Sequence, residues 1–178
     1  MNLDRRAFVG GATALTGSLA FLAAGCGSEA EAANFPLQLS EAEWRKRLNP
    51  AQFSVLRKGS TERPYSSPLN KEKRRGTFTC AGCGLPLYAS STKFESGTGW
   101  PSFTEPVDPA HVKAITDRSY GMTRTETRCA RCDSHQGHVF PDGPGPTGLR
   151  YCINSVALSF VPEGGRLPDP LGRGDGTA

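Results

Sequence analysis

The residues best placed to carry chemistry lie in the segment Arg150-Tyr151-Cys152-Ile153-Asn154. Side chains alternate along an extended strand, so Arg150, Cys152 and Asn154 are expected on one face and the apolar pair on the other. A guanidinium beside a thiol favours the thiolate, which is the nucleophilic form of cysteine. The alternative is a structural cysteine in the core, because free cysteine is among the most buried residue types.

Four of the six cysteines form two C-x-x-C pairs, Cys80 with Cys83 and Cys129 with Cys132. Each spacing lets two thiolates of one turn face the same ion, and four thiolates make a closed, structural zinc site. Two disulfides or a redox-active C-x-x-C pair are the alternatives. If zinc occupies these four, Cys152 is the only cysteine of the globular part without a structural role, which favours the reactive thiol.

Two further motifs carry side chains suited to substrate binding and proton transfer. Trp100 lies on a loop of small residues, where its ring can form an apolar wall that receives a methyl group or pack in the core. His135 and His138 are better suited to proton transfer than to metal binding, because the cysteines already complete a site. The alternative is that both histidines are hydrogen-bonded polar residues without a chemical role. Asp142, within Phe-Pro-Asp-Gly-Pro, is expected to be a turn residue.

The elements that position these residues begin with two short helices. Ser40 and Glu43 match a capping box at a helix start, and Asn49 followed by Pro50 matches a second start. Gly59 is suited to end the second helix in a left-handed conformation. The segment 61–70 contains two prolines and no periodicity, so an ordered coil is expected there.

The composition predicts one domain built from short strands and turns. The chain has 178 residues, with 21 Gly, 14 Pro, 37% hydrophobic and 21% charged residues. We expect a globular domain over residues 34–162 and a disordered tail over 163–178. The formal charge of +4 is too small and too scattered to indicate a nucleic-acid partner.

The alternation of apolar residues changes phase after the Cys152 segment. Apolar side chains occupy positions 151 and 153, and then positions 156, 158 and 160. A one-residue shift of this kind reverses the buried face of a strand. Either a β-bulge near Asn154 and Ser155 re-aims the strand beside the thiol, or the later half of the strand is buried on both faces. We predict the bulge.

Residues 1–33 have the pattern of an export signal. The segment Asp4-Arg5-Arg6-Ala7-Phe8-Val9 resembles a twin-arginine motif, and an uncharged stretch rich in Ala and Gly follows it. This predicts export of the folded protein to the periplasm or cell envelope. Cys26 follows Ala23-Ala24-Gly25 as in a lipoprotein processing site, whereas Ala30-Glu31-Ala32 offers a competing cleavage site. A lipid-anchored and a soluble periplasmic form both stay open.

Together these motifs resemble the B-type peptide methionine sulfoxide reductases, which act on the R epimer at sulfur. The resemblance runs from about Leu39 to Val161. It is carried by both C-x-x-C pairs and by three longer segments, which are KFESGTGWPSF at 93–103, HQGHVFPDGP at 135–144 and PTGLRYCINS at 146–155. It implies a mainly β, β-tent-like fold of two antiparallel sheets with small flanking helices. It also implies one structural zinc ion far from the chemistry.

The resemblance also implies a role for each site residue. Cys152 would be the nucleophile that becomes a sulfenic acid, with Arg150 favouring its thiolate. Asn154, His135 and His138 would bind or protonate the departing oxygen. Trp100 would hold the methyl group, and Phe140 would complete the apolar wall. The zinc ligands would be Cys80, Cys83, Cys129 and Cys132.

One position departs from the family pattern. Many members carry a second, resolving cysteine where this chain has Thr98. We therefore expect an external thioredoxin-like protein or small thiol to reduce the sulfenic acid, with a non-acylated Cys26 as the alternative.

The sequence thus predicts an exported, monomeric repair enzyme that acts on oxidised proteins containing methionine-R-sulfoxide and has no nucleic-acid partner. Acylation of Cys26 would add a membrane surface as a partner. Two alternatives remain, a zinc-ribbon binding module and an inactive, thiol-sensing relative that keeps a stable sulfenic acid.

Overall fold

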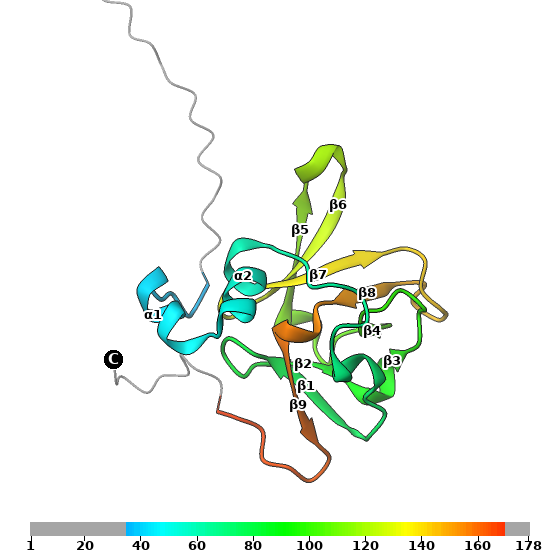
Figure 1. The fold of residues 1–178 in the computed structure, drawn as a ribbon. Coiled ribbons are helices and arrows are strands. Elements are labelled where there is room, and N and C mark those ends of the chain that lie inside the picture. Colours follow the sequence, from blue (N-terminus) through cyan, green and yellow to red (C-terminus); the bar gives the residue numbers. More distant parts are fainter. Residues whose placement is uncertain (1–34, 170–178) are drawn as a thin grey trace, which may run out of the picture. The chain divides into compact units, whose positions relative to one another are not determined.

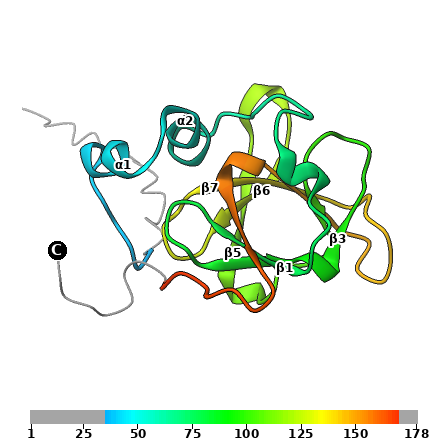
Figure 2. The same cartoon turned by 60° about the horizontal axis from the view of Figure 1, so that its bottom comes forward.

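The computed structural model describes residues 35–169. The expected export signal and Cys26 lie outside the described residues, as do positions 170–178 of the expected tail. Two antiparallel sheets form most of the domain, and two short helices pack on one side of them (Figures 1 and 2). This confirms the mainly β fold with small flanking helices. No helix within residues 35–169 is long and apolar enough to cross a membrane.

The two helices begin and end where their capping residues indicate. In α1 (Glu41–Arg47) the Ser40 side chain accepts from the Glu43 amide, and the Glu43 carboxylate accepts from the Ser40 amide. In α2 (Pro50–Lys58) Asn49 forms the equivalent capping box, and Gly59 ends the helix with φ 68°. Such caps satisfy backbone amides that have no partner inside the helix. Both predicted helices are confirmed.

The strands divide into two sheets of unequal size. The smaller sheet has the order β2-β1-β9 and the larger the order β3-β4-β8-β7-β6-β5. The strands are β1 (Gly76–Cys80), β2 (Pro86–Ala89), β3 (Lys93–Phe94), β4 (Ser102–Phe103), β5 (Val112–Asp117), β6 (Arg124–Cys129), β7 (His135–Phe140), β8 (Arg150–Ile153) and β9 (Leu158–Pro162). Five 3-10 turns connect them, η1 (Pro68–Lys71), η2 (Ser90–Thr92), η3 (Pro109–His111), η4 (Ser119–Gly121) and η5 (Ser155–Ala157).

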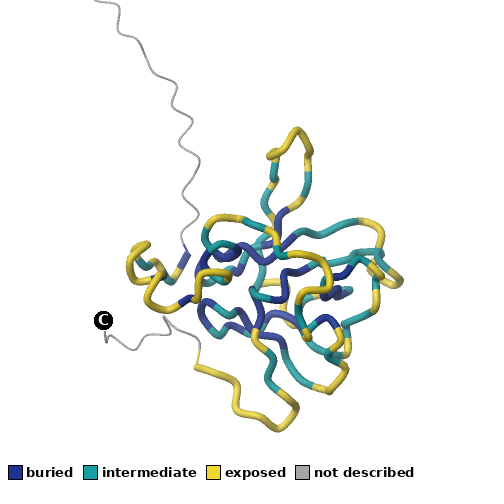
Figure 3. Tube along the Cα trace, viewed as in Figure 1, coloured by how far each residue is buried: buried dark blue, intermediate teal, exposed yellow. Residues whose placement is uncertain are grey.

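The core contains aromatic side chains from both sheets. Phe103 of β4 stacks on Tyr88 of β2 with ring centroids 4.5 Å apart, and it meets Phe78 of β1 edge-on at 5.1 Å. All three side chains are fully buried. The buried part of the chain lies at the centre of the domain, and exposed loops surround it (Figure 3). Each buried aromatic ring stabilises the fold by about 2–3 kcal/mol, so these contacts hold the two sheets together.

The predicted bulge after Cys152 is wrong. Strand β8 ends at Ile153, the turn η5 follows, and β9 then pairs with β1 in the smaller sheet. The apolar alternation changes phase because the chain leaves one sheet for the other at Asn154. The change of face was correctly indicated by the sequence, but its cause is a sheet switch and not an inserted residue.

The two segments predicted to lack regular structure differ from each other. Residues 61–67 form the expected coil, and η1 follows as a short turn. Residues 163–169 contain no helix or strand, and the Glu163 amide donates to the Arg75 carbonyl at 2.8 Å. The disordered tail stays a prediction.

Candidate active site and metal centre

The four cysteines of the C-x-x-C pairs form one buried cluster. Their sulfur atoms lie within 4.8 Å of one another, and each residue is at most 2% exposed. Cys80 and Cys132 are 3.7 Å apart at sulfur, and Cys83 and Cys129 are 3.6 Å apart. Cys80 is the last residue of β1 and Cys129 the last residue of β6, so the cluster links both sheets.

This arrangement fits a tetrahedral metal ion and not a pair of disulfides. Four sulfurs at about 2.3 Å from a central zinc ion would be about 3.8 Å from one another, close to the two shortest separations. A disulfide needs a sulfur–sulfur distance of about 2.05 Å. Because all four ligands come from the chain, a metal ion held here has no open position for water or substrate.

Cys152 lies in a different part of the domain. It is the third of the four residues of β8 and pairs directly with His138 of β7. The sulfur faces a pocket of about 160 Å³, whose lining is Thr61, Trp100, Arg124, Gly137, His138, Phe140, Cys152 and Asn154. Gly137 is required by this packing, because a Cβ atom there would lie 2.0 Å from the Cys152 carbonyl oxygen.

The environment of the Cys152 thiol has two opposing effects on its pKa. Burial raises the pKa above its ordinary value, and the Arg150 guanidinium and the Thr98 hydroxyl act in the opposite direction. Thr98 Oγ1 lies 4.0 Å from the sulfur. Arg150 is itself bound by Asp142, with two contacts of 2.8 Å. Asp142, expected only as a turn residue, therefore holds the guanidinium that favours the thiolate.

A register shift in the larger sheet brings the two histidines together. Residues three apart in a regular strand point to opposite faces. Between β6 and β7 the register shifts, so that Thr127 pairs with Gly137 and Arg128 with His135. The extra residue at Gln136 returns His135 to the face of His138, and their ring centroids are 5.5 Å apart.

His138 is the histidine that reaches the pocket. Its Nε2 lies 2.8 Å from the Asp117 carboxylate, which also forms a 2.6 Å ion pair with Arg124. Burial lowers the pKa of His138 below its ordinary value, and Asp117 acts in the opposite direction. Because a carboxylate only accepts hydrogen bonds, Nε2 carries the proton of the neutral ring.

His135 is placed behind His138 and does not line the pocket. It is 5% exposed, and its Nδ1 lies 2.6 Å from Glu126 Oε1. Its Nε2 is buried without a hydrogen-bond partner among the described residues. The predicted role of His135 in binding the departing oxygen stays a prediction. The other two residues predicted to bind that oxygen, His138 and Asn154, line the pocket.

Glu62 ties the two sides of the pocket together. Its amide donates to Asn154 Oδ1 at 3.0 Å, and its carbonyl accepts from Trp100 Nε1 at 3.2 Å. Its carboxylate accepts from the backbone amides of Ser155 and Val156 at the start of η5. A single residue of the coil thus fixes the indole, the amide side chain and the turn that follows β8.

The same coil packs closely on the loop that carries Trp100. The Tyr65 amide donates to the Gly99 carbonyl at 2.8 Å, and Tyr65 Oη donates to the Gly97 carbonyl at 2.6 Å. A Cβ atom at Gly99 would lie 2.6 Å from Pro64 Cβ, so only glycine allows this approach. The coil therefore fixes the position of Trp100 in the pocket wall, both through the indole itself and through the loop that precedes it.

The predicted site residues therefore separate into two groups. Trp100, His138, Phe140, Cys152 and Asn154 line one pocket, whereas His135 and Arg150 lie outside its lining. Arg150 contacts the Phe140 ring at 4.6 Å and acts on Cys152 through its charge.

Sequence reasoning missed three residues that organise the pocket. These are Glu62, Asp117 and Arg124. Arg124, Glu126 and Arg128 recur with period two, which places them on one face of β6 and was a usable signal. Glu62 gave no local signal, because its partner Asn154 is 92 positions away.

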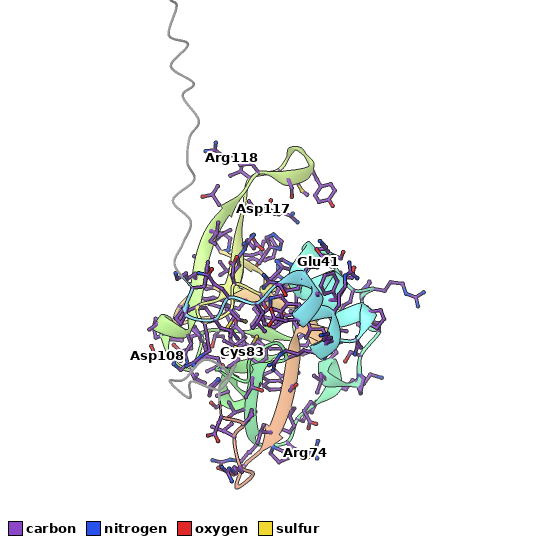
Figure 4. The ribbon with its side chains drawn as sticks, turned by 90° about the vertical axis from the view of Figure 1, so that its left-hand side faces the viewer. Glu41, Arg74, Cys83, Asp108, Asp117 and Arg118 are labelled. Carbon is purple, nitrogen blue, oxygen red and sulfur yellow. The ribbon has the colours of Figure 1, made fainter. Side chains whose placement is uncertain are left out.

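The pocket and the cysteine cluster have no residue in common. Figure 4 shows Asp117, the partner of His138, near the hairpin of β5 and β6, and Cys83 of the cluster well separated from it. Together, a half-buried thiol facing a histidine and an apolar wall, and a separate closed cysteine cluster, define a class of protein that combines thiol chemistry with a structural metal site.

Comparison with known proteins identifies the family. A SelR domain matches residues 48–162. Peptide methionine sulfoxide reductase MsrB of Bradyrhizobium diazoefficiens is 57% identical over 124 residues, which are 70% of this chain and 89% of that protein. The MsrB of Caulobacter vibrioides is 56% identical over 140 residues, 79% of this chain and 88% of that protein. The MsrB of Pseudomonas putida W619 is 57% identical over 123 residues, which are 69% of this chain and 92% of that protein. The chain belongs to the MsrB family of peptide methionine sulfoxide reductases.

Proposed function

We propose that this protein reduces the R epimer of methionine sulfoxide in proteins, with Cys152 as the nucleophile. The observation that carries the proposal is the direct pairing of Cys152 with His138 across β7 and β8, beside the Trp100 and Phe140 rings. A sulfoxide sulfur accepts a thiolate only when its oxygen is protonated or strongly hydrogen-bonded. A nucleophile, a proton donor and an apolar wall are therefore needed around one small pocket.

The reaction balances in two stages. In the first, the Cys152 thiolate attacks the sulfoxide sulfur while His138 supplies a proton to the oxygen. Methionine leaves with two more electrons, and the oxygen ends on Cys152 as sulfenic acid. In the second, an external thiol attacks the sulfenic sulfur, water leaves, and a second thiol breaks the resulting mixed disulfide. Asn154 would hold the oxygen, and Arg150 would favour the thiolate form.

An external reductant is supported by the cysteine inventory. Apart from the metal cluster, Cys152 is the only cysteine within residues 35–169, and the Thr98 hydroxyl lies 4.0 Å from its sulfur. A thioredoxin-like protein or a small thiol would therefore meet the sulfenic acid directly. The cluster itself would hold one zinc ion with a structural role, because its four ligands leave no open coordination position.

The reaction is tested with dithiothreitol and racemic dabsyl-methionine sulfoxide, with the two epimers separated after incubation. We expect consumption of the R epimer alone by the wild type. Consumption of the S epimer would contradict the stereochemical assignment. Equal activity of wild type and Cys152→Ser would contradict the assignment of the nucleophile.

We also propose twin-arginine export to the cell envelope, supported by the Asp4-Arg5-Arg6 motif and the uncharged segment that follows it. Mass spectrometry of the mature N-terminus tests this. An acylated Cys26 would indicate a lipid-anchored enzyme, whereas cleavage near Ala32 would indicate a soluble one. An intact N-terminus in the native host would contradict export.

A further inference from the structure

His138 presents only one of its two ring nitrogens to the catalytic pocket. Its Nε2 lies 2.8 Å from Asp117 Oδ2, and Asp117 lies outside the pocket lining. His138 itself lines the pocket, so Nδ1 is the ring nitrogen left to face it. Cys152 is directly opposite His138 across β7 and β8. Side chains opposed in this way share one face of the sheet, with Cβ atoms about 4.5–5.5 Å apart, so Nδ1 and the Cys152 sulfur belong to the same small space.

Asp117, the last residue of β5, stays a carboxylate at neutral pH (Figure 4). Its Oδ1 accepts from the Ser119 amide at 2.8 Å, and its Oδ2 accepts from Arg124 at 2.6 Å as well as from His138. These hydrogen bonds, with those from Ser119 as the largest contribution, hold the pKa of Asp117 well below its usual range. Because a carboxylate only accepts, Nε2 of the neutral ring must donate, and Nδ1 presents a lone pair.

Cys152 and His138 share one transferable proton in the resting site. Burial is the largest effect on both groups, and it raises the pKa of the thiol and lowers that of the imidazole. At neutral pH the proton therefore rests on the sulfur, opposite the lone pair of Nδ1. Charged or titratable groups also pack around the ring from β5, β6 and β7, namely Asp117, Arg124, Glu126 and His135.

This one proton completes the balance of the first stage of the reaction. A thiol and a sulfoxide give a sulfenic acid and a thioether, so the oxygen moves to Cys152 and two electrons of its sulfur pass to methionine. The hydrogen of the sulfenic acid is then the hydrogen of the original thiol, and solvent need not supply one. The carrier of this proton must accept it from the sulfur and release it to the oxygen within one pocket, which a histidine can do.

We infer that Asp117 is a positioning residue that keeps His138 protonated at Nε2, so that Nδ1 takes the proton of Cys152 and passes it to the sulfoxide oxygen. The inference rests on the proposed function and names the source of the proton that the first stage uses. Asp117 lies outside the pocket and acts through His138 alone. Its negative charge faces the imidazolium that exists between the two proton transfers, as a carboxylate behind a catalytic histidine does.

His135 provides an internal reference, because its arrangement is the reverse. Glu126 Oε1 lies 2.6 Å from Nδ1 of His135, so the proton of that ring is on Nδ1. Two histidines on one face of the same strand are therefore expected as opposite tautomers.

The test reads the tautomer of each histidine from long-range proton–nitrogen NMR correlations at slightly alkaline pH. The chain has three histidines, so His111→Gln and His135→Gln assign the signals. In the wild type we expect His138 protonated at Nε2 and His135 at Nδ1. In Asp117→Ala the Arg124 guanidinium is left beside Nε2 and donates to it. His138 should then change to the form protonated at Nδ1, while His135 should not change.

The activity of the variants should follow the tautomer. Asp117→Ala should lower kcat/KM for N-acetylmethionine-R-sulfoxide about 100-fold, as expected for loss of general acid–base catalysis. In Asp117→Asn the amide oxygen still accepts from Arg124 and from Nε2. This variant should keep the wild-type tautomer and lose only about tenfold, because a neutral acceptor holds the imidazolium less strongly.

Asp108→Ala is the matched control. Asp108 Oδ1 accepts from the amide two residues ahead at 2.8 Å, as Asp117 Oδ1 does, but it lies before β5 and away from the pocket lining. The substitution should change neither the His138 tautomer nor kcat/KM.

The tautomers are measured without substrate, so their result does not depend on the proposed function. The expected change in Asp117→Ala would support the positioning role of Asp117 even if neither epimer of the sulfoxide were reduced. An unchanged tautomer in that variant, or equal kcat/KM of variant and wild type, would overturn the inference. So would a wild-type His138 protonated at Nδ1, and this measurement suffices even if Asp117→Ala does not fold.

Discussion

The two cysteine regions of the domain contain the same functional group in opposite surroundings. In the metal cluster each sulfur has other sulfurs as its neighbours, and the residues are at most 2% exposed. Cys152 is half-buried, and its neighbours are a hydroxyl, a guanidinium and a histidine. Under the function proposed above, exposure and the number of sulfur neighbours, and not the residue type, distinguish the cysteines assigned to stability from the one assigned to chemistry.

The largest effect is expected from disruption of the cysteine cluster. We expect Cys129→Ser to lose the metal ion and most of the stability of the domain, because binding of a structural zinc ion, the ion proposed here, is worth about 10 kcal/mol or more of folding free energy. Metal analysis and thermal unfolding measure both effects. Full metal content with an unchanged Tm would refute the structural assignment.

The reciprocal variant should separate activity from stability. Cys152→Ser is expected to lower kcat/KM by about 10³-fold or more, because the hydroxyl is a poor nucleophile without a strong base. Its zinc content and its Tm should match those of the wild type. A variant that lost its zinc together with its activity would show that the two regions are not independent.

Glu62 tests whether the pocket depends on its connecting coil. In Glu62→Gln an amide would face two backbone N–H groups, and one hydrogen bond to η5 would be lost. We expect the free energy of unfolding to fall by about 1–3 kcal/mol. The resulting displacement of Trp100 and Asn154 should lower kcat/KM between about tenfold and a hundredfold.

Glu163→Gln is the matched control, because it removes a carboxylate from an exposed ion pair with Arg75. Its effect on stability should stay within about 1 kcal/mol, with no effect on kcat/KM. If Glu62→Gln behaved in the same way, the positioning role of Glu62 would be wrong.

The smallest expected effect is in the pH dependence. Burial lowers the pKa of His138 and raises the pKa of Cys152, so the histidine loses its proton at a lower pH than the thiol. Between these values, each unit of pH raises the thiolate fraction and lowers the protonated histidine fraction by the same factor. The product is constant, so kcat/KM should be flat between the pKa of His138 and that of Cys152 and fall on both sides.

Substitution of the histidine checks this interpretation. In His138→Gln only the thiolate fraction depends on pH, so the residual kcat/KM should rise with pH until the Cys152 thiol is fully ionised, without an alkaline decrease. A narrow optimum in the wild type, or a retained alkaline decrease in the variant, would contradict the assigned acid and nucleophile.

The features that sequence predicted correctly depend on local rules. The helix caps at Ser40 and Asn49 and the spacing of the cysteine pairs each require only a few neighbouring residues. The family resemblance then placed Trp100, Phe140 and His138 around Cys152, and the pocket brings these four together.

The features that sequence could not predict depend on pairing between distant segments. His135 and His138 share a face only because of the register shift opposite Thr127 and Arg128. The change of phase after Cys152 required knowledge that β9 pairs with β1. The expectation that Arg150 would lower the thiol pKa holds for its own contribution, but burial outweighs it, and burial is a property of the whole fold.

The most direct test of the account is to trap the oxidised cysteine after a single turnover. The protein is mixed with one equivalent of methionine-R-sulfoxide peptide without reductant, treated with dimedone, and mapped by mass spectrometry. The account predicts one dimedone adduct, on Cys152, in amounts equal to the methionine formed, and none on the four cluster cysteines. Methionine formation with no adduct on Cys152, or with an adduct on a cluster cysteine, would contradict it.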